Sequence, residues 1–192
     1  KTGHLKGNRF QVRVRGRSED EDEALFHRLK LIEVHGMPNA FGSQRFSDGE
    51  TVAIGLEALR GRAIRDKRLL RLGVSALQAF LFNHWLAARA HDGGLRRALR
   101  GDWLRKRDTG GVFRCDEPDV DTQRMAEGEL TPTGPLYGVK LRAATDDAGL
   151  LEQAILRHAG LDAQAFMPVK RIAPGARRDA LVFPTECGLR RD

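Results

Sequence analysis

Residues 35–46 carry the side chains best suited to chemistry on a planar ring. They read His-Gly-Met-Pro-Asn-Ala-Phe-Gly-Ser-Gln-Arg-Phe, and the two glycines and the proline favour a rigid loop over a helix or an alternating strand. A Phe displayed beside Asn, Gln and Arg suits an unstacked nucleobase, because the ring covers the face of the base and the polar groups bind its edges. The alternative is an ordinary connecting loop whose rings, Phe41 and Phe46, lie in the core.

The composition limits the classes of protein to which the chain can belong. Its 192 residues are 41% hydrophobic, enough for one large domain or two small ones with a real core. Lys and Arg number 33 against 26 Asp and Glu, so the net charge of +7 makes a polyanion a candidate partner. Cys115 and Cys187 lie far apart without Cys or His at metal-ligand spacing, which excludes a zinc ribbon. No apolar stretch approaches the roughly 20 residues that span a bilayer, so we predict a cytoplasmic protein without a metal.

A strand and a helix are expected before the loop. Apolar and polar residues alternate over 9–17, from Phe10 to Val14, which is the period of a half-buried strand, and its polar side is basic. Acidic residues and then apolar residues at helical spacing predict a helix over 18–34. The basic face of the strand either meets a polyanion or is an ordinary solvated face.

The pattern after the loop predicts further helices, separated by basic segments. Residues 50–62 and 75–90 have the spacing of amphipathic helices, with Ser75 opening the second after a basic connector at 62–71. Arg and Lys gather again at 96–107. Further on, we expect a short strand at 110–115, a rigid loop at 131–138, helices near 147–158 and 162–166, and a buried strand at 179–184.

Three motifs occur in a fixed order along the first 90 residues. Residues 1–10 contain Gly7-Asn8-x-Phe10, residues 36–46 read Gly-x-Pro-Asn-x-Phe-Gly-x-Gln-Arg-Phe, and a later segment reads Asn83-x-x-Leu86-x-x-Arg89. In this combination the chain resembles the TruD family of tRNA pseudouridine synthases, and it departs from the family's central motif only at the final Gly, which is Ser47 here. Three ordered motifs disfavour the alternative of a generic basic protein that binds no RNA and matches by accident.

The resemblance implies a fold, a domain plan and a reaction. The fold is α+β (mixed α/β), with the sheet of a pseudouridine-synthase-type catalytic domain interrupted by an inserted α/β TRUD domain. Residues 1–65 and 179–192 would belong to the catalytic domain and residues 66–178 to the insertion. The reaction is isomerisation of uridine to pseudouridine in tRNA, of the uridine-13 type, by a monomer that needs no cofactor and no metal.

The nucleophile that the resemblance implies is not found in this sequence. The family uses an Asp in a Gly-x-Lys-Asp motif, and the nearest Lys/Asp neighbour pair here, Asp66-Lys67, stands in the basic connector and is no credible substitute. We therefore expect the nucleophilic Asp to lie outside this chain, and the 192 residues alone to be inactive. A non-catalytic RNA-binding module derived from the same fold is the alternative function.

The resemblance also assigns roles to individual residues. By motif position, Phe41 stacks on the detached uracil, and Asn39 shapes the loop or hydrogen-bonds near the base. Asn83 and Arg89 lie on about one helix face, and we favour a clamp that supports the loop over a direct RNA contact. The supporting residues are Gly36, Pro38, Gly42, Gln44, Arg45, Asn83 and Arg89. The candidate phosphate contacts are Lys6, Arg13, Arg15, Arg96, Arg97, Arg100, Arg105 and Arg107, with a solvated surface as the alternative for the 96–107 cluster.

Overall fold

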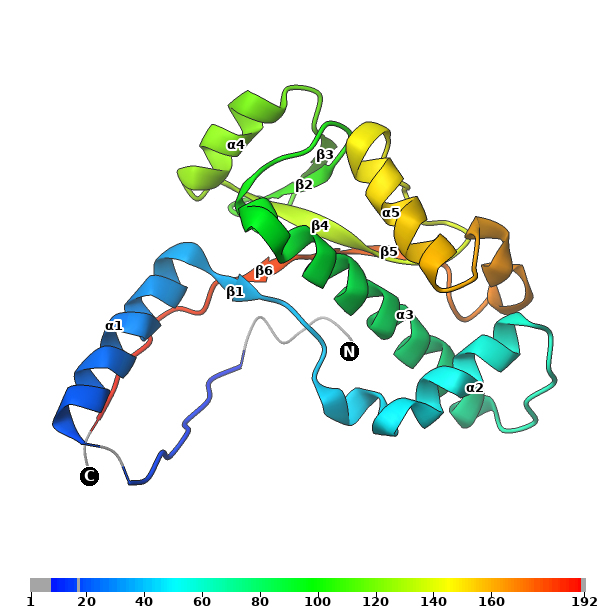
Figure 1. The fold of residues 1–192 in the computed structure, drawn as a ribbon, viewed down its shortest axis with the longest axis horizontal. Coiled ribbons are helices and arrows are strands. Elements are labelled where there is room, and N and C mark those ends of the chain that lie inside the picture. Colours follow the sequence, from blue (N-terminus) through cyan, green and yellow to red (C-terminus); the bar gives the residue numbers. More distant parts are fainter. Residues whose placement is uncertain (1–7, 17, 191–192) are drawn as a thin grey trace.

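The computed structural model describes residues 8–16 and 18–190, and its mixture of helices and antiparallel sheet confirms the α+β class. Two sheets are present in these residues (Figure 1). The smaller pairs β1 (Met37–Pro38) with β6 (Leu181–Val182). The larger has the order β3-β2-β4-β5, formed by β3 (Val112–Arg114), β2 (Trp103–Lys106), β4 (Leu130–Leu136) and β5 (Ala176–Asp179).

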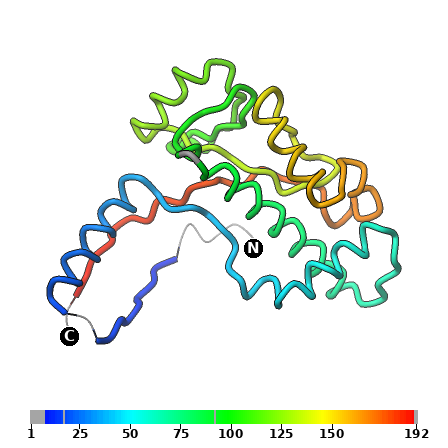
Figure 2. Tube along the Cα trace, viewed as in Figure 1, coloured from blue at the N-terminus to red at the C-terminus, as the bar shows by residue number. Residues whose placement is uncertain are grey.

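Helices surround and connect the sheets. The α-helices are α1 (Glu19–His35), α2 (Glu50–Leu59), α3 (Lys67–Ala90), α4 (Pro118–Ala126) and α5 (Asp146–His158). Short 3-10 turns stand between them: η1 (Ser43–Arg45), η2 (Ser47–Gly49), η3 (His91–Arg96) and η4 (Ala163–Val169). The segment after β6 returns along α1 (Figure 2), where the Cys187 N–H donates to Glu33 Oε1 at 2.5 Å.

Helix α3 is the centre of the core and packs on both sides, as its apolar composition predicts. Helix α3 packs against α2 and α5, and its almost fully buried Leu77 and Leu81 belong to a core cluster that also contains residues of η4. Its second half presents Phe82 and Trp85 to the sheets. Gly134 on β4 allows this close approach, since a Cβ there would lie 2.3 Å from the Trp85 ring.

The expected strand at 9–17 is wrong. Residues 8–15 have no regular secondary structure, and the side chains of Phe10 and Val12 are 81% and 79% exposed. Alternation marks a strand only when a partner strand supplies the ladder hydrogen bonds. No strand pairs with this segment in the described part of the chain, so no ladder supports the alternation.

Helix α3 begins earlier than expected, at Lys67 and not at Ser75. Asp66 is its N-cap, because the carboxylate accepts the backbone N–H groups of Arg68 and Leu69. The second half of the basic connector, residues 67–71, is therefore the start of the helix. Asp66 is an N-cap residue type, but the surrounding basic residues led us to predict a connector there.

The expected loop at 131–138 is also wrong, because residues 130–136 form β4. Pro132 and Pro135 argue against a central strand, since each lacks a ladder donor. Residues 130–132 of β4 pair with β2, whereas residues 133–136 pair with β5. Pro135 pairs with Arg177 of β5, whereas Pro132 pairs with Leu104 of β2 and its carbonyl also accepts the Ala180 N–H at 2.8 Å.

The last strand region differs from its prediction in extent. The expected strand at 179–184 is present as β6, but the chain already enters the larger sheet at Ala176 as β5, three residues before the predicted start. The helix expected near 162–166 is the 3-10 turn η4, which runs on to Val169 with Pro168 inside it. The helices over 18–34, 50–62 and 147–158 and the strand at 110–115 are confirmed within a few residues.

The two cysteines should differ sharply in reactivity. Cys115 is fully buried beside Leu104 and Leu130, and burial is the main cause that raises the pKa of its thiol to about 12. Cys187 is partly exposed. Because the thiolate is the reactive form, we expect a thiol reagent at pH 8 to modify Cys187 and leave Cys115 intact until urea is added. Mass spectrometry of the labelled peptides measures this, and labelling of native Cys115 would contradict the packing described here.

Candidate RNA base-binding loop

The loop at residues 36–46 is fastened at its start by the end of α1. Gly36 ends that helix with φ 72°, and its N–H donates to Ile32 O at 2.8 Å. A Cβ on Gly36 would lie 2.9 Å from the ring of Phe183, so the motif glycine is required both for its conformation and for this contact. Met37 and Pro38 then pair with β6, which carries the chain towards Asn39.

Every polar group of Asn39 has a hydrogen-bond partner. Its backbone N–H donates to Ala180 O at 2.8 Å, and its Nδ2 donates to Asp179 O at 2.9 Å. Its Oδ1 accepts from the Arg178 guanidinium at 2.5 Å, and its carbonyl accepts from the same group at 3.2 and 3.3 Å. The structure therefore places Asn39 as a brace between the loop and the β5–β6 connection.

Asn83 of α3 holds the next part of the loop. Its Oδ1 accepts the backbone N–H of Phe41 at 2.9 Å, and its Nδ2 donates to the Phe41 carbonyl at 2.8 Å. One side-chain amide thus pairs with both polar groups of one residue, as a neighbouring strand would. The backbone of Phe41 is fixed to the most buried helix of the protein.

The ring of Phe41 is half-buried and lies among aromatic and cationic groups. It meets the ring of Phe82 edge to face, with centroids 5.7 Å apart and an interplanar angle of 81°. The guanidinium carbons of Arg178 and Arg45 lie 4.1 and 5.0 Å from its centroid. The ring therefore combines features of both alternatives from the sequence. It packs on the core ring of Phe82, as a core residue does, and it has polar cationic groups beside it, as a displayed ring does.

The remaining supporting residues contribute less to the loop. Gln44 is exposed in η1, and Gly42 has open space around its Cα and an ordinary φ of −69°, so no steric reason for a glycine is visible there. Arg45 donates to Ser75 Oγ at 2.5 Å and so joins η1 to α3. Phe46 packs edge to face on Phe80, with centroids 6.3 Å apart.

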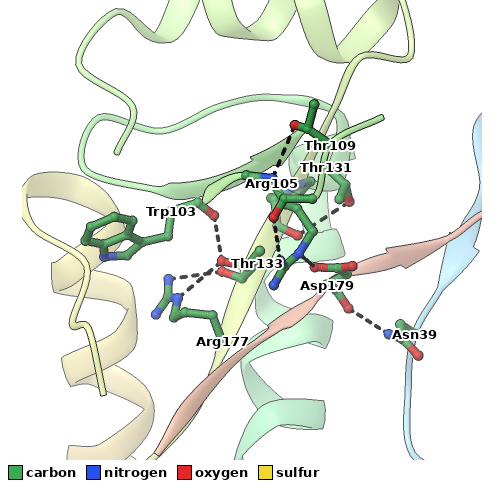
Figure 3. A network of polar contacts seen from close by, with 11 residues as sticks. Asn39, Trp103, Arg105, Thr109, Thr131, Thr133, Arg177 and Asp179 are labelled. Carbon is green, nitrogen blue, oxygen red and sulfur yellow. Dashed lines mark hydrogen bonds and ion pairs between the residues drawn. The ribbon is translucent and has the colours of Figure 1, made fainter. Parts of the chain in front are cut away.

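A polar network on the larger sheet extends from the loop (Figure 3). The Asp179 carbonyl accepts from Asn39, while its carboxylate binds Arg105 Nε at 2.5 Å. On the adjacent strands, Arg177 donates to Thr133, and it forms an ion pair with Glu152 at 2.5 Å in which both side chains are 6% exposed. The position of Asn39 is thereby connected, through β5, to buried charges of the sheet.

Arg89 does not contact the loop. It is 3% exposed, forms an ion pair with Asp102 at 2.5 Å and donates to the Arg97 carbonyl at 2.6 Å. Desolvation lowers the pKa of Arg89, and the Asp102 carboxylate opposes that shift. Arg89 is a clamp, but it braces residues 97–102 and not the loop at 36–46.

The predicted phosphate contacts divide into separate groups. Arg13 and Arg15 are exposed on the irregular segment, and Lys6 lies outside the described residues. Arg96, Arg97 and Arg100 are exposed next to one another. Arg105 is only 29% exposed and bound to Asp179, while Arg107 stacks on the Phe183 ring at 3.6 Å and donates to Gly128 O. The last two are occupied by contacts within the protein.

Reasoning from the sequence missed Arg178, which has the most contacts with the motif residues. It lies in a run of basic residues before the predicted strand, which we interpreted as solvent-exposed, and its partners Asn39 and Phe41 are far away in the sequence. The signal that was available is the strand period, which places Arg178 and Ala180 on one face of a strand through residue 180. Ala180 is fully buried.

Breaking the Asn83 clamp should loosen the loop without unfolding the protein. In an Asn83→Leu variant the N–H and carbonyl of Phe41 lose their partners, and an unmade buried hydrogen bond costs about 1–3 kcal/mol. We expect faster hydrogen exchange at the Phe41 amide by roughly tenfold or more, with unchanged exchange in β2 and β4. Asn83→Gln is the matched control, because it keeps the side-chain amide but lengthens the side chain by one methylene. Unchanged hydrogen exchange at Phe41 in Asn83→Leu would contradict the clamp.

Among the described residues, no cluster of three or more His, Cys, Asp or Glu side chains is placed to hold a metal ion, and no helix has the length and apolar character needed to cross a membrane.

Comparison with known proteins identifies the family. The family model for tRNA pseudouridine synthase D (TruD) matches residues 1–65 and 62–191. A tRNA pseudouridine synthase D of Anaeromyxobacter sp. (strain Fw109-5) is 42% identical over 93% of this chain and 52% of its own length. The protein of that name from Thermus thermophilus is 36% identical over 93% of this chain and 49% of its own.

A solved structure shows the same fold. The crystal structure of a putative TruD from Methanosarcina mazei superposes with a TM-score of 0.69 at 20% identity, over 88% of this chain and 57% of that one. The chain spans about half the length of the curated relatives that it matches. On the family model and on these relatives, this chain belongs to the TruD family of tRNA pseudouridine synthases.

Proposed function

We propose that this chain holds the target uridine of a tRNA pseudouridine synthase, and that the full-length protein isomerises that uridine to pseudouridine. The observation that carries the proposal is the doubly clamped loop. The side-chain amide of Asn39 bonds to the Asp179 carbonyl and to Arg178, and that of Asn83 bonds to the backbone of Phe41. Together they hold the half-buried Phe41 ring at one edge of the core. A ring fixed in this way stacks on a base without losing conformational freedom in the process.

The clamps serve a reaction in which the base is briefly detached. Pseudouridine formation breaks the bond between uracil and ribose, turns the uracil and joins it again through carbon, so a surface must retain the free base meanwhile. Extrusion of the uridine costs a few kcal/mol of unstacking. Stacking on an aromatic side chain returns about 1–3 kcal/mol per base, which is the contribution assigned here to Phe41. The nucleophilic Asp is proposed to lie outside these 192 residues.

The proposed substrate is tRNA, and the proposed target is a uridine of the uridine-13 type, in the cytoplasm. Incubation of the full-length protein with a tRNA transcript, followed by mapping of pseudouridine by chemical modification and reverse transcription, tests this directly. Conversion at position 13 supports the proposal, and conversion at another uridine corrects the target. Tight tRNA binding without any pseudouridine would favour the alternative, a non-catalytic RNA-binding module of the same fold.

The basic residues at 96–107 are proposed to contact tRNA only in part. Arg96, Arg97 and Arg100 are exposed, whereas Arg105 is bonded to Asp179. Each phosphate neutralised on a duplex steepens the slope of log affinity against log salt by about 0.9. A triple Ala variant at the three exposed positions should therefore shallow the slope by roughly two to three units. Arg105→Ala should leave it unchanged, and an unaltered slope in the triple variant would remove these residues from the RNA surface.

A further inference from the structure

We propose that Arg45 and Arg178 form an anion site beside Phe41, which binds the phosphate of the nucleotide whose base stacks on that ring. The inference rests on the proposed function and adds to it a second contact point for the same uridine. The ligand is a phosphate ester of a uridine nucleotide, held by two guanidinium groups.

Two cations from distant parts of the chain meet at one ring. Arg45 belongs to η1, inside the loop, and its guanidinium carbon lies 5.0 Å from the Phe41 centroid. Arg178 belongs to β5, and its guanidinium carbon lies 4.1 Å from the same point. The fold thus gathers two positive charges at the one residue to which the base-stacking role is assigned.

Among the residues that the structure describes, no carboxylate is bound to either guanidinium. Within the described residues, Arg45 and Arg178 form no ion pair, and the carboxylate of Asp179, adjacent to Arg178, is bound by Arg105 Nε at 2.5 Å. Burial lowers the pKa of Arg178, and the positive charge of Arg45 lowers it further, with Asp179 opposing the shift. Two cations that repel each other in a partly desolvated place are stabilised by an anion that contacts both.

The two arginines are restrained to different degrees, as a site that must admit a nucleotide requires. Arg178 makes three hydrogen bonds to the carbonyl and side chain of Asn39. Arg45 is exposed and makes one side-chain hydrogen bond, to Ser75 Oγ. A phosphate therefore meets Arg178, which is already fixed, and Arg45, which can turn towards the phosphate when a base stacks on the ring.

The guanidinium fork of Arg45 also matches the ligand in shape, whereas Arg178 already donates from Nε and Nη2 to Asn39 and offers its Nη1. Two N–H groups of an Arg bind two phosphate oxygens in parallel, which a point charge such as Lys does not do. A carboxylate supplied by another part of the protein is the second source of an anion with this chemistry. The two sources differ in one measurable respect, because only a nucleotide phosphate makes the phosphorylated ligand bind better than the nucleoside.

Titration of the full-length protein with uridine and with uridine 5′-monophosphate, followed by NMR or calorimetry, tests the site. A charge-assisted contact corresponds to roughly a tenfold or greater preference for the monophosphate. Arg45→Gln should abolish the preference, and Arg45→Lys should restore it only in part. Arg114→Gln is the matched control, since the exposed Arg114 of β3 is paired with Asp116 and its loss should leave the preference intact.

Equal affinity of the wild-type protein for the two ligands would overturn the proposal and indicate a protein carboxylate as the anion. If neither uridine nor its monophosphate binds, the salt dependence of tRNA binding tests the site instead. The proposal then requires Arg45→Gln to shallow the slope of log affinity against log salt by about 0.7–0.9. An unchanged slope would overturn the proposal as well. Failure of the full-length protein to form pseudouridine, with the monophosphate preference intact, would reject the proposed function and leave the anion site standing.

Discussion

Replacing Phe41 by Ala in the full-length protein should lower kcat/KM for tRNA by roughly 5- to 150-fold, which is the loss of one base–aromatic stack of about 1–3 kcal/mol. The effect on folding should be smaller than for a core ring. Phe41 is only half-buried, and its edge-to-face contact with Phe82 is of a kind worth about 0.5–1.5 kcal/mol beyond burial. Single-turnover kinetics and urea-induced unfolding measure the two effects separately.

Phe46→Ala is the matched control for this experiment. Phe46 is also half-buried, stands in the same motif and loses a similar edge-to-face contact, with Phe80. It should therefore reproduce the change in stability without the loss of rate. If Phe41→Ala lowers the free energy of unfolding by about 3–5 kcal/mol, as loss of a core Phe does, and turns over tRNA normally when folded, Phe41 is a core residue and the stacking role is wrong.

Replacing Arg89 by Met should destabilise the protein by about 3–5 kcal/mol, because it leaves the carboxylate of Asp102 buried without its cation. Both side chains are 3% exposed, and the same Arg89 guanidinium also satisfies the Arg97 carbonyl. Urea denaturation monitored by Trp fluorescence reports the change. Arg114→Met, which breaks the exposed pair with Asp116, should cost no more than about 1 kcal/mol.

A double variant separates the buried charge from the lost packing. Arg89→Met combined with Asp102→Leu removes both charges, so much of the lost stability should return, as replacement of a buried ion pair by apolar residues is often neutral. If the double variant is no more stable than Arg89→Met, the lost stability comes from packing and not from the unpaired charge, and the RNA-contact hypothesis for Arg89 needs a separate test. That hypothesis requires Arg89→Met to weaken tRNA binding while the free energy of unfolding stays the same.

Local signals in the sequence predicted the elements whose cause is local. Ser18 caps α1 and accepts the N–H of Glu21, and the acidic first turn after it is visible in the sequence. The start of the motif loop was located for the same reason, since Gly36 ends α1, although Met37–Pro38 form the short strand β1 and Ser43–Arg45 a 3-10 turn inside the predicted loop. The predicted strand at 9–17 is wrong because a strand needs a neighbour, and β4 was missed because Pro132 and Pro135 argue against a strand that has neighbours on both sides, as β4 has in β2 and β5.

The candidate site required tertiary structure. Asn39 and Asn83 were selected by resemblance, but their hydrogen-bond partners come from β5, from the residue that follows it and from the loop itself. For Arg178 the only local signal was the strand period shared with Ala180, and it was outweighed because a basic residue in a basic run is ordinarily solvated. The pairing of Arg89 with Asp102 joins α3 to a turn that carries no pattern of its own. Contacts of this kind depend on which segments the core brings together, and the periodicity of one segment does not contain that information.

Helix α3 fixes a distance as well as a core. Asn83 grips the Phe41 loop and Arg89 grips residues 97–102, and the two grips are six residues apart on one straight helix, about 9 Å along its axis. The loop that is proposed to receive the base and the turn that carries Arg97 and Arg100 are therefore both bonded to the same helix, which sets their spacing together with the contacts of the loop to β5 and β6. One residue inserted between positions 83 and 89 would keep both grips but rotate one loop about 100° relative to the other. An RNA whose flipped base and phosphate backbone match the present spacing would then no longer fit both at once.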